Sequence, residues 1–108
     1  MSAKWETYID GLRDDAGTLA KEELKNLVFE AKSDTDLFIR DQGWKMEKYL
    51  TQLAAGEITK EQFKGNIEDL KDLVEMRQLE LSVAAKASAQ RIIRGISKLM
   101  IEGLLKLL

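Results

Sequence analysis

The chain has 108 residues, and 17 Lys and Arg against 19 Asp and Glu give it a formal charge of −2. That length corresponds to one domain, residues 1–108, and 44% hydrophobic with 33% charged residues is typical of a folded protein rather than a disordered one. The sequence lacks Cys, His and Pro, which excludes disulfides, thiolate nucleophiles and any site that uses an imidazole as base or metal ligand.

A short first helix is predicted over residues 3–16. Its apolar residues recur three or four positions apart, as on one face of a helix: Trp5, Tyr8, Ile9, Leu12 and Ala16. Residues 14–18 combine poor helix formers with a Gly, so we expect a break there. The chain does not start with a basic stretch followed by an apolar one, so we expect no secretory signal and a cytoplasmic protein.

A long second helix is predicted over residues 19–54. Gly43 and the polar cluster at residues 33–36 weaken its middle, but no Pro interrupts the apolar pattern. Residues 55–59 form the clearest turn in the chain. Gly56 suits the left-handed position just past a helix end, and Thr59 with Gln62 matches a capping box.

One apolar stripe continues from Phe63 to the end of the chain without a stop signal and predicts a third helix over residues 60–108. Its members at 63, 74, 85, 96 and 107 are 11 residues apart, a period of about 3.67 residues per turn. A helix of about 48 residues is about 72 Å long. A compact domain of this size is only about half that length across. A shorter partner helix therefore cannot cover the whole stripe.

The expected fold is all-α: an elongated antiparallel helical hairpin with a short N-terminal helix, which pairs into a four-helix-bundle-like homo-oligomer. A dimer is favoured. The competing arrangement is a compact single-chain bundle whose helices break at unmarked points, and missing Gly and Pro signals disfavour it. The residues assigned to the oligomer or partner interface are Phe63, Ile67, Leu70, Val74, Leu81, Ala85, Ile92, Ile96, Met100, Leu104, Leu107 and Leu108. Phe29 and Trp44 fall off the main stripe of the second helix and are assigned to a second contact surface.

The C-terminal segment has its own charge balance, because residues 91–108 carry four basic side chains and one acidic one. With 17 residues and several charges, the apolar part at residues 92–108 is too short to span a bilayer. Three hypotheses remain for its wide apolar arc: an oligomer core, which is favoured, a groove on a different helical protein, or an anionic membrane surface. In the membrane hypothesis a stripe of basic residues faces the headgroups: Arg91, Arg94, Lys98 and Lys106.

No motif in the chain predicts catalysis, a metal or a cofactor. The segment that starts at Asp34 resembles the opening of a calcium loop, but Ile39 and Lys45 stand where that loop requires Gly and Glu. The acidic balance disfavours binding to nucleic acid. We therefore expect a non-enzymatic structural or adaptor module that self-associates through amphipathic helices, with lipid-surface binding through residues 91–108 as the alternative.

Overall fold

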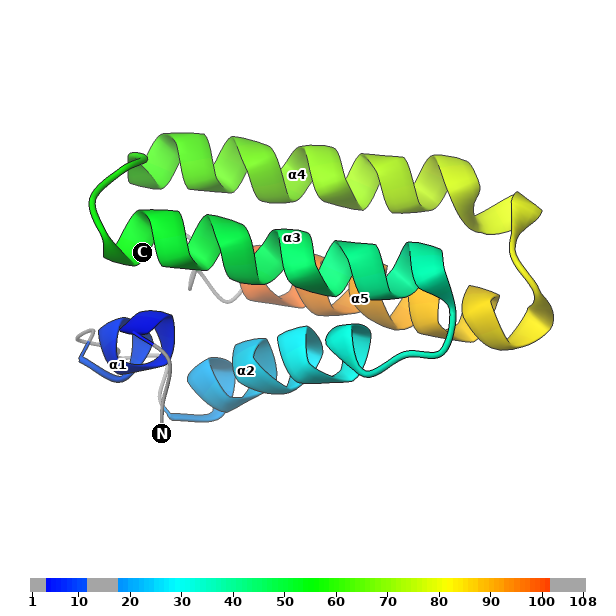
Figure 1. Cartoon of the computed structure of the whole chain (residues 1–108), viewed down its shortest axis with the longest axis horizontal. Coiled ribbons are helices and arrows are strands. Elements are labelled where there is room, and N and C mark those ends of the chain that lie inside the picture. The colour runs from blue at the N-terminus through cyan, green and yellow to red at the C-terminus, as the bar shows by residue number, and fades with distance from the viewer. Residues whose placement is uncertain (1–3, 12–17, 102–108) are drawn as a thin grey trace.

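The computed structural model describes residues 4–11 and 18–101, and over these ranges the secondary structure is entirely helical. The prediction of an all-α protein is confirmed. The elements, shown in Figure 1, are α1 (Lys4–Asp10), α2 (Thr18–Lys32), α3 (Leu37–Ala54), α4 (Lys60–Arg77), the 3-10 turn η1 (Gln78–Glu80) and α5 (Val83–Ile101). The predicted first helix, residues 3–16, lies partly outside the described residues.

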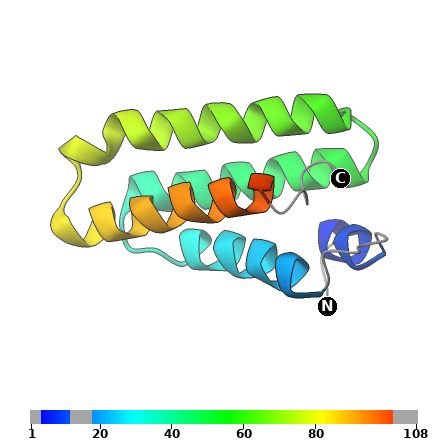
Figure 2. The same ribbon diagram turned by 180° about the vertical axis from the view of Figure 1, so that it is seen from behind.

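The four longer helices, α2 to α5, lie side by side, and each runs antiparallel to the one before it (Figures 1 and 2). Each packs against the next along the chain, and α5 returns to pack against α2, so the four surround one shared interior. We call this arrangement the four-helix core. The described part of the chain measures 39 × 28 × 23 Å and has a radius of gyration of 13.3 Å. It is therefore a compact globule, not an elongated hairpin.

The predicted continuous helix over residues 19–54 is wrong, because the chain turns between α2 and α3. The backbone N–H of Asp36 donates to the Asp34 carboxylate over 2.8 Å, and Asp36 in turn accepts from the N–H of Ile39 over 3.1 Å. Asp36 is thus the N-cap of α3. Its carboxylate accepts a hydrogen bond from a backbone N–H of the first helical turn, which has no carbonyl partner within the helix. The polar cluster does more than weaken a helix: it ends one and starts the next.

The predicted continuous helix over residues 60–108 is also wrong, because the chain turns again between α4 and α5. After η1 the backbone becomes extended at Leu81, and the Ser82 hydroxyl accepts from the N–H of Ala85 over 3.2 Å. Leu81 packs against the core and anchors this turn. A serine cap and one partly buried leucine therefore end the helix without Gly or Pro. Consequently α5 folds back beside α4 instead of extending it.

The turn between α3 and α4 has the structure that its sequence predicts. Gly56 adopts a positive φ of 74°. The Thr59 hydroxyl accepts from the N–H of Gln62 over 3.0 Å, and the Gln62 side chain accepts from the N–H of Thr59 over 2.8 Å. The capping box is therefore complete, and it fixes where α4 begins.

Helix α1 packs against the ends of α3 and α2 (Figure 1). Trp5 and Ile9 are buried against the four-helix core, and Lys25 of α2 forms an ion pair with Asp10 at 2.6 Å. The hydrogen bond from the Lys25 ammonium to Asp10 raises the pKa of Lys25 above its ordinary value, against the opposing effect of burial. Both apolar burial and this ion pair hold α1 in place.

The close contact between α2 and α3 depends on Gly43. A Cβ atom at this position would lie 2.4 Å from the backbone nitrogen of Lys32 and 2.8 Å from the carbonyl carbon of Ala31. These are backbone atoms, which cannot move aside as a flexible side chain can. Gly43 therefore lets two helix backbones touch, a role that its low helix propensity does not reveal.

We expect Gly43→Ala to lower the free energy of unfolding by about 1–3 kcal/mol, because the added methyl group pushes α2 away from α3. Gly65→Ala is the matched control. Gly65 also lies inside a helix, but a Cβ there meets nothing within 4 Å. That change should raise stability by up to about 1 kcal/mol through helix propensity. Urea denaturation of both variants tests this, and equal effects of the two changes would contradict the assigned role of Gly43.

Candidate interaction surface

The described residues contain no group of three or more acidic side chains placed to hold a metal ion. Within the same ranges, none of the helices combines the length and apolar character that crossing a bilayer requires. The concave features are shallow, such as an open groove of about 420 Å³ between α2 and α5. The exposed side chains of the described residues are the remaining features that a partner can contact.

The stripe assigned to an oligomer interface is mostly buried inside a single chain. Seven of its members have at most 5% of their surface exposed: Phe63, Ile67, Leu70, Val74, Ala85, Ile92 and Ile96. Leu81 and Met100 are partly buried against the same core. This assignment needs correcting, because the neighbouring helices of the same chain already cover these side chains. Leu104, Leu107 and Leu108 lie outside the described residues.

The basic stripe on α5 is engaged with α2. Arg91 pairs with Glu30 at 3.0 Å, and Lys98 pairs with Glu23 at 2.6 Å. The Nε group of Arg94 donates to the backbone carbonyl of the preceding helical turn. These side chains line the groove between α2 and α5, where carboxylates of α2 neutralise two of them. Lys106, the fourth member of the stripe, lies outside the described residues.

Large apolar side chains are exposed in two places in the described part of the chain. One set lies at the end of the four-helix core that holds the α2–α3 and α4–α5 turns (Figure 1). We call it the turn-end patch, and its members are Leu37, Met76, Leu79 and Val83. The second set is Phe29 and Trp44, on neighbouring helices α2 and α3. The structure thus places both aromatic residues of the predicted second contact surface outside the core.

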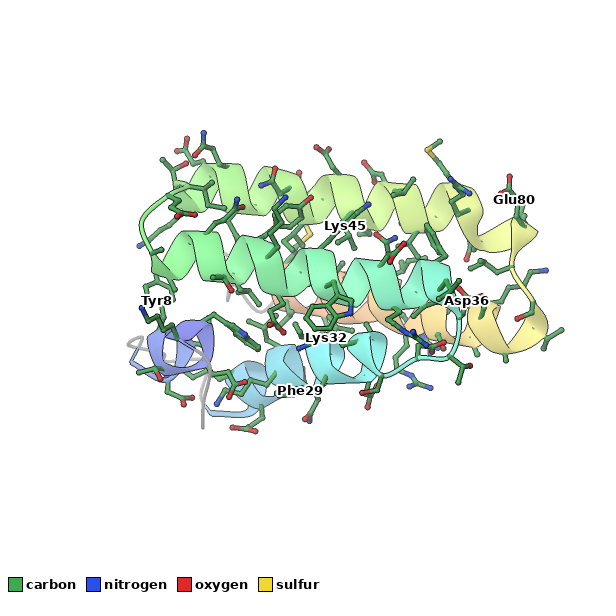
Figure 3. All side chains as sticks on the ribbon, viewed as in Figure 1. Tyr8, Phe29, Lys32, Asp36, Lys45 and Glu80 are labelled. Carbon is green, nitrogen blue, oxygen red and sulfur yellow. The ribbon has the colours of Figure 1, made fainter. Side chains whose placement is uncertain are left out.

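Lys32 joins the two aromatic side chains. Its ammonium lies 4.3 Å from the centre of the Trp44 ring and 5.8 Å from the centre of the Phe29 ring. It also forms an ion pair with Glu47 of α3. Figure 3 shows Phe29 and Lys32 side by side along α2, with Lys32 directed toward α3. We define these four residues, Phe29, Lys32, Trp44 and Glu47, as the aromatic patch.

The aromatic patch is fixed to the protein interior on one side and open on the other. Phe29 contacts buried Trp5 of α1, with ring centres 6.4 Å apart. The adjacent Gly43 brings the two helices close enough for Lys32 to reach across to α3. Trp44 nevertheless keeps 54% of its surface exposed. More than half of the Trp44 surface is thus accessible to solvent, and tryptophan is one of the residue types enriched at protein interfaces.

Comparison with known proteins does not add a function: no protein family matches the chain, and neither does any curated protein or solved structure. The candidate surface therefore rests on its own geometry and chemistry.

The sequence indicated the two aromatic residues of the patch, but not Lys32 and Glu47, which connect them. The sequence signal for Phe29 and Trp44 was their position off the apolar stripe. Lys32 and Glu47 are 15 residues apart on different helices, so their pairing depends on the turn that was not predicted. The four exposed side chains of the turn-end patch were missed for the same reason, since a continuous helix has no turn at which they could cluster.

We expect Trp44→Ala to lower the free energy of unfolding by about 1 kcal/mol or less, the usual value of an exposed cation–π contact. Trp5→Ala is the comparison. Trp5 is 1% exposed, so its truncation should cost about 3–5 kcal/mol. Urea denaturation followed by circular dichroism measures both. A loss at Trp44 as large as that at Trp5 would mean that Trp44 serves the fold instead of a partner.

Proposed function

We propose that this protein is a non-enzymatic helical module that self-associates through the aromatic patch. The observation that carries the proposal is the exposed ring of Trp44, held in place by Lys32. Tryptophan is among the residues that contribute most to binding energy at protein interfaces. The absence of His and Cys from the sequence supports a role without catalysis. A cytoplasmic location is retained as part of this proposal.

The polar members of the patch suit burial in an interface. Lys32 and Glu47 neutralise each other within one chain, so a partner that covers them does not leave an isolated charge. The two aromatic rings supply the apolar centre, and the ion pair supplies a polar edge. This is the usual composition of an interface, with an apolar centre surrounded by satisfied polar groups.

The proposed dimer differs from a pair of hairpins that complete one bundle. Each chain already closes its own four-helix core, so the two copies join as finished units through their surfaces. Such a contact is smaller and more polar than an obligate dimer interface. We therefore expect a reversible association whose extent depends on protein concentration.

Lipid-surface binding through residues 91–108 has less support. The apolar face of α5 that a membrane would need includes Ile92, Ile96 and Leu99, which are at most 3% exposed. Exposing them requires opening the four-helix core. Two basic side chains of the stripe are also already paired with glutamates of α2.

Sedimentation velocity over about 1 µM to about 1 mM protein tests the proposal, since this range covers dissociation constants typical of reversible contacts. We expect a concentration-dependent dimer, weakened at least about tenfold by Trp44→Ala because an interfacial Trp commonly contributes more than about 1.4 kcal/mol. Leu79→Ala is the matched control: Leu79 is 83% exposed but belongs to the turn-end patch. It should leave the dimer unchanged.

A monomer throughout that range would contradict self-association. A dimer lost in the Leu79 variant but not in the Trp44 variant would move the interface to the turn-end patch.

A further inference from the structure

A line of exposed side chains runs along the outward face of α3, and Lys45 and Thr51 are exposed beside it. Leu37, Asp41, Trp44 and Lys48 follow one another at intervals of four, three and four residues, which places them on one side of the helix. All four are exposed, and Trp44 lies between the two charged residues. The aromatic patch is thus bordered along α3 by a negative charge on one side and a positive charge on the other.

Neither charge has a partner among residues 4–11 and 18–101. Neither Asp41 nor Lys48 forms an ion pair or a side-chain hydrogen bond with any residue that the structure describes. They are seven residues apart on one helix, about 10 Å along its axis, so they cannot pair with each other. Other ion pairs of the surface, such as Arg77 with Glu80, are closed within one chain. Asp41 and Lys48 are therefore two opposite charges available to a partner.

The geometry points to a second copy of this chain as that partner, with its α3 lying antiparallel across the first. This inference rests on the proposed self-association through the aromatic patch. A two-fold axis that passes between positions 44 and 45 brings Asp41 of each copy opposite Lys48 of the other. Two ion pairs then form, one on each side of the two Trp44 rings. A parallel arrangement would instead set Asp41 against Asp41, which is repulsive.

The turn-end patch is a poorer surface for a second copy than the outward face of α3. Its neighbouring charges, Arg77 and Glu80, already pair with each other at 3.7 Å. The turn-end patch therefore offers apolar area, but these two charges are not free to select the orientation of a second copy. The α3 face offers both, because a symmetric contact must be complementary to itself and Asp41 and Lys48 satisfy that condition.

Charge exchange tests the pairing. Asp41→Lys and Lys48→Asp each turn both intermolecular pairs into repulsive ones, so each should weaken the dimer about tenfold or more at low salt. The double variant, with both changes, restores both pairs and should return dimerisation to within about threefold of the original chain. These residues are exposed, so the fold is expected to remain unchanged, which circular dichroism checks.

A cross-linking experiment tests the orientation independently, since the chain has no Cys of its own. In a mixture of the Asp41→Cys and Lys48→Cys variants, each mixed dimer keeps one Asp41–Lys48 pair and sets one Cys opposite the other. A short bismaleimide reagent should therefore join unlike chains in the mixture much more than like chains in either variant alone. Cross-linking of the Asp41→Cys variant with itself would overturn the antiparallel arrangement.

The outcomes separate the two proposals. If the unmodified chain is a monomer, self-association itself fails. If it is a dimer that Trp44→Ala weakens, while the double charge exchange does not rescue the single ones, the aromatic patch stands and the antiparallel pairing of α3 is wrong. If the rescue and the mixed cross-link both occur, the second copy lies antiparallel on α3.

Discussion

Burial of a long apolar stripe by a short chain is the constraint on which the structure depends. Apolar residues at helical spacing extend through α4 and α5, and one straight helix would leave much of this stripe in water. The chain satisfies the constraint by ending helices early and returning α5 against both α4 and α2. Backbone N–H groups set free at these turns are then satisfied by side-chain oxygens of Asp36 and Ser82. Hydrophobic burial supplies the driving force, and side-chain caps choose where the chain turns.

The turn between α2 and α3 is also tied to α5. The Ser88 hydroxyl donates to the Asp34 carboxylate over 2.6 Å, while the other oxygen of that carboxylate holds the N–H of Asp36. The guanidinium of Arg40 donates to the Asp34 backbone carbonyl over 3.1 Å. One short turn thereby connects three helices. Its position in the chain determines how α3 lies on α2, and so which residues of α3 face outward.

The surface proposed for binding follows from the interior packing. Gly43 faces α2 and removes the side chain that would hold the two helices apart. Trp44, the next residue, points outward and receives the Lys32 ammonium from α2. A glycine and a tryptophan in succession thus give one helix a close internal contact and an exposed aromatic ring.

The sequence by itself determined that the chain is helical, that Thr59 and Gln62 begin a helix, and which residues form the apolar stripe that needs cover. These features depend on residue spacing and on local hydrogen bonds. It also separated Phe29 and Trp44 from the buried stripe. It did not determine what covers the stripe. Asp34 and Asp36 end one helix, and Leu81 and Ser82 end another. In the sequence alone, these residues are compatible with the surface of a continuous helix, because the contacts that fix the two turns come from distant parts of the chain. Only the tertiary structure decided that one chain closes its own core. Burial of the apolar stripe against a helix that folds back outweighs the local preference of the chain to continue the same helix.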